Sequence, residues 1–488
     1  MISIPELVTF IIYFIFLMAV GLYFYRKTAN LEDYLLGGRN MGKWVTALSA
    51  QASDMSGWLL MGLPGAVFLF GINQSWIAIG LFIGTVINWI LVAPRLRLHT
   101  ERSGSITLPS FLENRFKDPT GLLRIISSII ILFFFTIYAS SGLVAAGRLF
   151  ESMFAMDYRT AVLIGGLVIV VYTFLGGFLA VCWTDLLQGT LMLLAVIVVP
   201  AVAFVTAGGA SGIAEAMAAR DISAALIPSG PLPLIAIIST MAWGLGYFGQ
   251  PHILARFMSI SSVKQLPQAT TIAVVWVAFS LGFAVIVGLV GIPLFPDLAG
   301  PEAETVFIQM IRLVFSPWIG GILLAAILSA IMSTIDSQLL VSSSALTEDI
   351  YKRSINQQAG ERKLMWIGRV SVVVISIVAL VLALNPQNTI LGLVAYAWGG
   401  FGAAFGPVIL MALFSRKATW QAALAGMVSG TVVLVLWERL GLGATMYEIV
   451  PGFIANYIAI MIVNRLVQQS DETVIKNFDD IAAELRTG

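Results

Sequence analysis

The sequence predicts an all-α integral membrane protein with about 13 transmembrane helices, and three observations lead to this fold class. First, 59% of the 488 residues are hydrophobic and only 11% are charged, whereas soluble domains carry about 25% charged residues. Second, apolar segments of about 20 residues, long enough to span a bilayer as helices, recur from Leu7 to Val467. Third, the basic residues gather in every other loop. A large water-soluble domain does not fit in this chain.

Charged residues and clusters of proline or glycine divide the apolar sequence into segments that we predict to be helices. The first segment follows Ser3-Ile-Pro-Glu6, a pattern typical of a helix start. It is too long for the apolar part of a cleaved signal, so we expect it to remain in the mature protein. The predicted helices span Leu7–Tyr25, Val45–Phe70, Gln74–Pro94, Leu122–Phe150, Arg159–Gly176, Trp183–Val205, Leu234–Ala255, Ala269–Leu294, Trp318–Leu346, Gly368–Leu384, Leu391–Phe414, Trp420–Trp437 and Tyr447–Val467.

The distribution of basic residues predicts the orientation of the chain. If the N-terminus lies outside, the inner segments contain roughly 22 of the 27 Lys and Arg residues, including Arg39 and Arg256. Because the bias alternates at nearly every loop, an odd number of spans fits the pattern. We therefore expect the N-terminus outside and the C-terminus in the cytoplasm. The basic residues assigned to the outer side are Arg148, Arg159, Arg220, Arg312 and Arg439.

The second and the seventh predicted helices contain residues that interrupt a helix. Ser53-Asp54-Met55-Ser56-Gly57 lies near the middle of the second, and glycines precede Pro251 in the seventh. Proline and glycine break the hydrogen-bond ladder and free backbone groups. Interrupted helices at matching positions in two halves indicate a transporter site near the membrane midplane. Because these two are five helices apart, we predict two five-helix units of opposite topology.

One face of the ninth helix and the break in the second are candidates for a cation site. Ala330, Ser333 and Thr334 stand at i, i+3 and i+4, so they share a face. Together with free carbonyls at Ala52 and Met55, their oxygens would give a sodium ion about five ligands. On spacing alone, the alternative that both hydroxyls bond back to their own helix stays open and is favoured.

Three acidic residues lie inside apolar segments, where an ionised side chain costs several kcal/mol unless it is paired or hydrated. Asp54 at the break would attract a cation, or it would cap the second half of the broken helix. Asp185 lies near the predicted start of the sixth helix, where an acid also stabilises the helix dipole. Asp336 follows Ser333 by three residues. For Asp185 and Asp336, a structural role and a hydrated exit path for a cation both stay open.

Tyr138, Trp243 and Tyr247 are aromatic residues in the middle of apolar helices, away from the interfacial belts where Trp and Tyr concentrate. Trp243 and Tyr247 stand at i and i+4, so we expect them to face one way, just before the break at Pro251. One interpretation is ordinary core packing. The other is a pocket wall for a small solute with an apolar body.

Several longer motifs resemble those of a known family. They are Leu35-Leu-Gly-Gly-Arg39, the stretch from Ser49 to Leu69, Tyr172 to Asp185, Trp243 to Met258, and Met332 to Asp349. In these motifs and over nearly its whole length, the chain resembles the sodium/solute symporters, and within them the branch that carries proline. The resemblance implies a five-plus-five inverted-repeat core of the LeuT-like fold, with helices two to eleven as the paired units.

The resemblance also implies roles for the candidate residues. The sodium ligands would be Ala52, Met55, Ala330, Ser333 and Thr334. Residues of sodium coupling or of the sodium path would be Asp54, Asp185, Arg39 near the inner mouth, and Asp336, where the proline branch commonly has a small neutral residue. The substrate pocket would contain Ser56, Gly57, Tyr138, Trp243, Tyr247 and Pro251.

From this resemblance we expect sodium-coupled symport of L-proline into the cell by alternating access, with Na⁺ as the coupling ion. The alternatives are symport of another small solute, such as pantothenate, a sugar or a monocarboxylate, and a transporter-like sensor, against which the short C-terminal tail argues. No His or Cys cluster indicates an enzyme, and a net charge of +1 offers no basic field for nucleic acid. The expected partners are the solute and membrane lipid, with no obligatory protein partner.

We expect a multi-pass protein of the bacterial inner membrane with four parts. Residues 1–40 form the first transmembrane helix and an inner loop, and residues 41–415 form the transport core, with repeats at 41–206 and 230–415. Residues 416–467 add two transmembrane helices, and residues 468–488 form a cytoplasmic tail.

Overall fold

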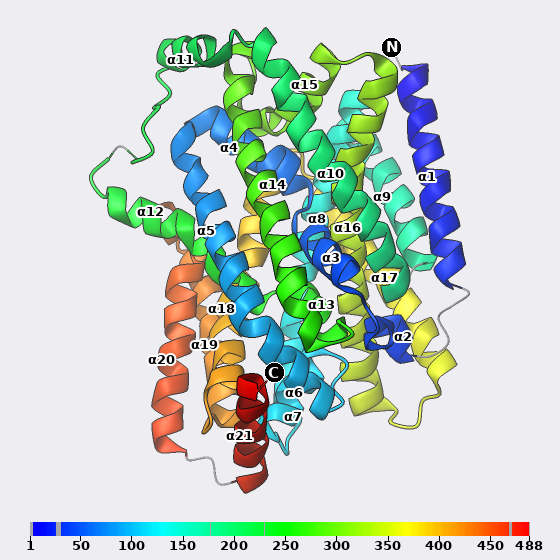
Figure 1. The fold of residues 1–488 in the computed structure, drawn as a ribbon, viewed down its shortest axis with the longest axis vertical. Helices are drawn as coiled ribbons and strands as arrows, with labels where there is room; N and C mark the ends of the chain where they lie inside the picture. The colour runs from blue at the N-terminus through cyan, green and yellow to red at the C-terminus, as the bar shows by residue number, and fades with distance from the viewer. Residues whose placement is uncertain (1–2, 26–30, 176, 229, 468–470, 488) are drawn as a thin grey trace.

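A computed structural model describes residues 3–25, 31–175, 177–228, 230–467 and 471–487 of the chain. Within these ranges the secondary structure is helical, apart from one isolated bridge between Met41 and Ile260. Most of the long helices run along the long axis of the molecule (Figure 1). The all-helical fold class is thereby confirmed.

In the described part of the chain, ten helical segments are long and apolar enough to cross a membrane, or eleven if the bent pair Lys43–Asp54 and Trp58–Phe70 is one span. Two shorter apolar helices, Tyr158–Phe174 and Pro233–Gly249, occupy the positions of the predicted fifth and seventh spans. The total of thirteen spans stays a prediction, because these two helices lie at the short end of the range of about 17 to 25 residues for a transmembrane helix.

Helices occur at every predicted position. In chain order they are α1 (Ile4–Tyr25), α3 (Lys43–Asp54) with η2 (Trp58–Gly62) and α4 (Leu63–Phe70), α5 (Ser75–Ile87) with η4 (Asn88–Val92) and α6 (Ala93–Arg102), α8 (Leu122–Phe154), α9 (Tyr158–Leu175), α10 (Phe178–Thr206), α12 (Pro233–Met241) with η5 (Ala242–Gly249) and α13 (Pro251–Ser259), α14 (Leu266–Leu294), α16 (Pro317–Ser344) with η8 (Ala345–Ile355), α17 (Glu361–Ala383), α18 (Ile390–Phe414), α19 (Trp420–Arg439) and α20 (Ile449–Leu466). Gly176, the predicted end of the fifth helix, lies outside the described residues.

Three helices extend well beyond their predicted ends, at the third, ninth and tenth positions. The third continues to Arg102, the ninth to Ile355, and the tenth begins at Glu361. The added turns are rich in charged residues, which end a hydropathy segment but do not end a helix. Hydropathy also did not detect five helices that are too short or too polar to form an apolar segment of about 20 residues. They are α2 (Leu31–Leu36), α7 (Leu108–Phe116), α11 (Gly209–Ala219), α15 (Val306–Val314) and α21 (Glu472–Thr487).

Both predicted helix breaks are confirmed. The first lies between α3 and the helix Trp58–Phe70, formed by η2 and α4, which is bent by 58° from α3, and Met55 leaves the helical region with φ −88° and ψ 79°. In the second, the α-helix becomes a 3₁₀-helix over Ala242–Gly249, and Gln250 is extended before Pro251 opens α13. Freed backbone groups at both breaks lie in the protein interior, where side chains satisfy them.

The break in the seventh span packs directly on two neighbouring helices, α5 and α18. Against α5 the approach is backbone to backbone: a Cβ on Gly80 would lie 2.2 Å from the Met241 carbonyl oxygen, and a Cβ on Gly84 would lie 2.4 Å from the Gly244 carbonyl oxygen. A Cβ on Gly244 would in turn lie 2.2 Å from the Gly80 carbonyl oxygen. Only glycine permits this spacing.

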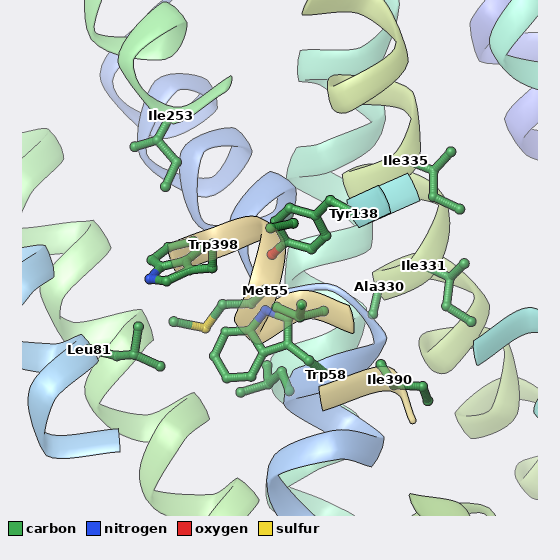
Figure 2. Packing of buried hydrophobic residues seen from close by; sticks show 14 of the residues in the cluster. Met55, Trp58, Leu81, Tyr138, Ile253, Ala330, Ile331, Ile335, Ile390 and Trp398 are labelled. Carbon is green, nitrogen blue, oxygen red and sulfur yellow. The ribbon is translucent and has the colours of Figure 1, made fainter. Parts of the chain in front are cut away.

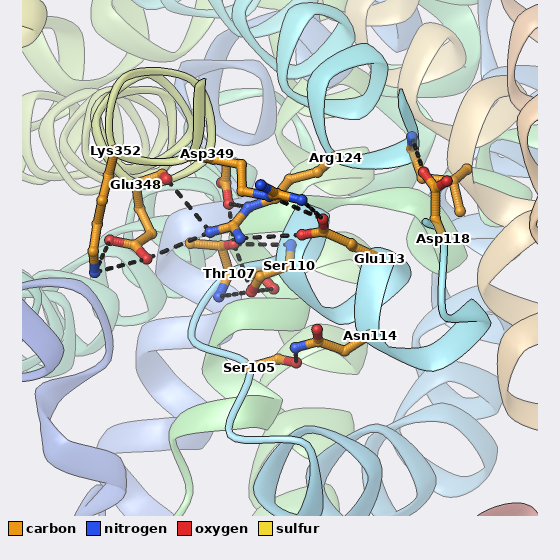
Figure 3. Close-up of polar contacts among 12 residues, drawn as sticks. Ser105, Thr107, Ser110, Glu113, Asn114, Asp118, Arg124, Glu348, Asp349 and Lys352 are labelled. Carbon is orange, nitrogen blue, oxygen red and sulfur yellow. Dashed lines mark hydrogen bonds and ion pairs between the residues drawn. The ribbon is translucent and has the colours of Figure 1, made fainter. Parts of the chain in front are cut away.

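A polar cluster joins α7, the start of α8 and η8 at one end of the core (Figure 3). Arg124 pairs with Asp349 at 2.7 Å, Glu113 at 3.1 Å and Glu348 at 3.4 Å. Thr107, which caps α7, donates to Asp349 at 2.8 Å. The acids at the end of the last motif in the sequence, Glu348 and Asp349, therefore hold these three elements together.

Candidate functional site

The main-chain carbonyl of Ala52, one turn before the first break, meets the predicted face of the ninth helix. The Ser333 hydroxyl donates to it at 2.7 Å, and the Thr334 hydroxyl donates to it at 3.2 Å. Ser333 also donates to its own helix at the Ala330 carbonyl, at 3.2 Å. Hydrogen bonding within α16 thus accounts for only one of the three hydrogen bonds that these two hydroxyls donate. The structure thus brings together four of the five predicted ligand oxygens, which are the two carbonyls and the two hydroxyls. Met55, which would supply the fifth, follows at the end of α3.

Asp54 lies at the centre of the first break and is fully buried. Its main-chain carbonyl accepts hydrogen bonds from the Ser56 amide at 3.1 Å, the Trp58 indole at 3.0 Å and the Tyr138 hydroxyl at 3.2 Å. Its carboxylate accepts from the Tyr247 hydroxyl at 2.5 Å. The second carboxylate oxygen has no hydrogen-bond partner among the described residues.

The alternative in which Asp54 caps the second half of the broken helix is wrong. Its carboxylate receives a hydroxyl from the other broken helix, and Ser56 accepts the Trp58 amide instead, at 3.3 Å. Because Tyr247 lies in η5, this one hydrogen bond connects the two breaks directly.

Trp243 and Tyr247 were expected to share a face, and they do not. In a 3₁₀-helix, which has three residues per turn, positions i and i+4 point in different directions. The Trp243 ring packs near Trp58 and Tyr447, with centroids 6.4 and 5.5 Å apart. The Tyr247 ring packs edge-on against Trp398 at 5.0 Å. Tyr138 contributes a third ring beside the first break, as Figure 2 shows together with Met55, Trp58 and Trp398.

The remaining predicted pocket residues shape the breaks. Gly57 packs so closely on α8 that a Cβ there would lie 2.8 Å from the Cβ of Ala145. Pro251 is the first residue of α13, where its missing N–H costs nothing. Together with Ser56, they place the two interrupted helices against the aromatic residues.

Asp185 belongs to a buried ion-pair network that sequence reasoning missed. Arg256 of α13, which the charge pattern placed in an inner segment, is fully buried and lies 3.3 Å from the Asp185 carboxylate. Its guanidinium also donates to Ser337 at 2.5 Å and to Ser49 at 3.1 Å, and Ser49 donates to Asp185 at 2.7 Å. The network joins α3, α10, α13 and α16.

The expectation of a helix-dipole role for Asp185 is wrong. Helix α10 begins at Phe178, so Asp185 lies beyond its first turn, and its partner is a guanidinium rather than helix amides. The signal that could have identified Arg256 is a basic residue among apolar positions close to the second break.

Asp336 is also fully buried, and one of its carboxylate oxygens accepts a hydrogen bond from Thr173 of α9. It lies close enough to Asp185 for the two carboxyl groups to interact electrostatically. Arg39 is separate from these acids. Its guanidinium donates to the carbonyls of Thr100, Ser105 and Met258 at 3.1, 2.5 and 3.1 Å, which ties the chain before α3 to α6 and α13.

A cavity of about 370 Å³ opens beside the aromatic residues, and Trp243, Tyr447 and Glu304 line it. The Glu304 carboxylate accepts the first backbone amides of α18, from Ile390 and Leu391, at 2.8 and 2.9 Å. Burial raises the pKa of Glu304 to about 7, although these amides favour the ionised form. The cavity is therefore bounded by an aromatic wall and a buried acid.

Comparison with known proteins gives concordant matches. Residues 34–430 match the model described as the sodium:solute symporter family. The chain is 50% identical over 490 residues, which cover 99% of this chain and 97% of the relative, to a protein of Escherichia coli named sodium/proline symporter. It is also 50% identical to the high-affinity proline transporter PutP of Bacillus subtilis, over 95% of this chain and 98% of the relative.

Among solved structures, the chain resembles a Na⁺-coupled sialic acid symporter in a substrate-bound outward-open state. The TM-score is 0.79 at 20% sequence identity, over 95% of this chain and 98% of the other. At this identity the likeness shows the fold, which is the predicted LeuT-like one.

Proposed function

The chain belongs to the sodium:solute symporter family, and from this membership and the geometry of the two breaks we propose that it carries L-proline into the cell together with sodium. Sodium is the coupling ion of this family. The names of two relatives at 50% identity over nearly the full length support proline as the solute. The single observation in the structure that carries the proposal is the hydrogen bond between Tyr247 and Asp54, which joins the aromatic residues to the acid at the first break.

The proposed sodium ligands are the carbonyls of Ala52, Met55 and Ala330 and the hydroxyls of Ser333 and Thr334. The donor chemistry fits, because a hard cation prefers oxygen ligands. The hydroxyls lie 2.7 to 3.2 Å from the carbonyl oxygens of Ala52 and Ala330, so four of the proposed ligands already lie close together. Sodium at this position would hold α3 against α16.

The proposed substrate pocket lies between the breaks and is lined by Tyr138, Trp243 and Tyr247, with Ser56, Gly57 and Pro251 shaping its walls. An aromatic wall suits a pyrrolidine ring, whereas a sugar requires more amide and acid side chains. Asp54 couples the two sites, because it is two residues from the Ala52 carbonyl and its carboxylate binds the Tyr247 hydroxyl.

The proposed sodium path continues from the ninth helix toward Asp185 and Asp336. Arg256 holds Asp185 now, so sodium leaving by this path competes with the guanidinium for the carboxylate. Arg39 is proposed to hold the inner end closed through its carbonyl contacts. With the N-terminus outside, as the basic residues favour, the cavity at Trp243 faces the outer side and the tail faces the cytoplasm.

The test is uptake of radiolabelled L-proline by purified protein in proteoliposomes, with and without an inward sodium gradient. We expect accumulation only with the gradient, and stronger competition by unlabelled proline than by glucose, pantothenate or alanine. Replacing external sodium by potassium is the matched control. A competitor stronger than proline would overturn the substrate, and equal accumulation in potassium would overturn the sodium coupling.

A further inference from the structure

Trp398 of α18 contacts the break in the seventh span at several points, although neither the motifs nor the predicted pocket include it. It is 1% exposed, and its indole N–H donates to the main-chain carbonyl of Trp243 at 2.7 Å. Its ring meets the Tyr247 ring edge-on, with centroids 5.0 Å apart. One side chain thus contacts Trp243 and Tyr247, two of the three aromatic residues of η5.

The main chain of Trp398 holds the other end of the same break. The side-chain amide of Gln250, the extended residue after η5, donates to the Trp398 carbonyl at 3.2 Å. Trp398 therefore accepts a hydrogen bond from the last residue of the break and donates one to a residue at its start. The indole bond gives the Trp243 carbonyl a partner outside its own helix where α12 becomes a 3₁₀-helix, and the Gln250 bond ties the end of the break to α18.

The sequence of η5 accommodates this indole at one position in particular. A Cβ on Gly246 would lie 1.8 Å from the indole nitrogen of Trp398. Only glycine leaves room for the ring to lie against the 3₁₀ backbone between Trp243 and Tyr247. The indole and the glycine are complementary parts of one contact.

This contact determines where the Tyr247 hydroxyl points. Asn88 fixes the Tyr247 main chain by donating to its carbonyl at 3.1 Å, and the Trp398 ring limits the space behind the Tyr247 ring. With both restraints the hydroxyl reaches Asp54. With a smaller ring at position 398, the Tyr247 ring would have space to move back toward α18. This movement would enlarge the proposed substrate pocket.

We propose that Trp398 is a positioning and specificity-determining residue: it holds η5 in its 3₁₀ form and sets the ring size of the imino acid that the pocket accepts. This inference rests on the proposed transport of proline. A wild-type protein without sodium-driven proline uptake refutes that function, whereas the comparison of variants below refutes the role of Trp398 alone.

The test compares Trp398→Phe with Trp437→Phe in proteoliposomes. Trp437 is the matched control, because its indole also donates to a main-chain carbonyl, that of Met446 at 2.9 Å, but it lies on α19 and its partner is not part of η5. For Trp398→Phe we expect the KM for proline to rise about fivefold to tenfold, as for one lost hydrogen bond, with kcat within about twofold. The KM ratio of pipecolate to proline should fall, because the six-membered ring gains space.

Equal KM values and equal pipecolate ratios in the two variants would overturn the proposal. If Trp398→Phe does not fold, Gln250→Met provides a second test, since it removes one donor and leaves both rings. We expect it to raise the KM for proline with an unchanged ring-size ratio. An unchanged KM in Gln250→Met would overturn the role of Trp398 in holding η5.

Discussion

Ser333 and Thr334 share one acceptor, the Ala52 carbonyl, although the two side chains leave α16 at successive positions. A carbonyl at the end of a broken helix has no helical amide to serve it, so these hydroxyls complete its hydrogen bonding. The same atoms can turn their lone pairs toward a cation, since a hydroxyl oxygen both donates and accepts. A single cluster of oxygens therefore suits both a closed helix contact and an ion site.

Thr334→Ala should weaken sodium binding without removing a pocket wall. The loss of one hydroxyl leaves a hard cation short of an oxygen in a buried site, so more sodium should be needed for half-maximal proline binding. Proline affinity should recover at saturating sodium. Asp54→Asn should raise the sodium concentration for half-maximal binding further than Thr334→Ala does, because it removes a negative charge from the buried break. The measurement is proline binding across a sodium titration.

Thr431→Ala is a suitable control for that titration, because the Thr431 hydroxyl lies on α19 and donates back to its own helix, to the Met427 carbonyl at 2.8 Å. A sodium titration of Thr334→Ala that coincides with the wild type would remove the ninth helix from the cation site.

Much of the residue-scale site could be predicted from sequence, for a physical reason. Ser333 and Thr334 are local to one helix, and the residues that interrupt helices are visible as glycine, proline and a buried acid. Arg256 and Trp398 could not be assigned in the same way. Their partners lie on other helices, far along the chain, and only the packing of α13 and α10 on α3 and of α18 on η5 brings them together. The prediction that Trp243 and Tyr247 share a face was wrong, because hydropathy does not distinguish an α-helix from a 3₁₀-helix.

At the scale of elements, the start of α18 depends on Glu304, an acid from a different segment. The first amides of a helix need acceptors, and here a buried carboxylate beside the cavity supplies them. Because burial raises the pKa of Glu304 to about 7, the folded protein binds a proton there more tightly than an unfolded chain does.

This linkage predicts a pH dependence of stability. Between the ordinary Glu value and about pH 7, the folded state holds more protons at Glu304 than the unfolded state, so stability falls as pH rises through that window. Glu304→Gln should remove this part of the decline, which amounts to about 3 kcal/mol at most. Thermal unfolding in detergent from pH 5 to pH 8 measures it. Glu302→Gln, at an exposed neighbour in the same 3₁₀ turn, should retain the wild-type slope.

At the scale of the whole molecule, the C-terminal helix α21 connects parts of the chain that are far apart in sequence. Its acids pair with Arg102 at 2.5 Å and with Arg416 at 2.7 Å. Its apolar side buries Val474 and Ile481, and the Phe478 ring lies 5.4 Å from the Arg115 guanidinium. Exposed ion pairs contribute about 0 to 1 kcal/mol each, whereas a buried Ile contributes about 1.5 to 3 kcal/mol. The apolar contacts should dominate.

Salt and mutation should therefore act differently on α21. At 1 M salt the Debye length falls to about 3 Å, yet the helix should remain docked, because apolar burial is not screened. Ile481→Ser should release it. Limited proteolysis of the C-terminal segment reports docking, with Asp479→Ala as the control that removes one ion pair alone. Rapid cleavage of the wild type in high salt would show that charge, and not apolar burial, holds the helix.

The glycine contacts between α5 and η5 have a mechanical consequence. No layer of side chains separates the two backbones at Gly80, Gly84 and Gly244, so neither can slide past the other without a collision of main-chain atoms. We therefore expect α5 and η5 to move as one rigid unit, so that any displacement of α5 also displaces Trp243 and Tyr247. Asp54 and Tyr138 lie outside this unit, on α3 and α8. In the proposed transport cycle, the hydrogen bond from the Tyr247 hydroxyl to the Asp54 carboxylate is the contact that has to break for the first broken helix to separate from this rigid pair.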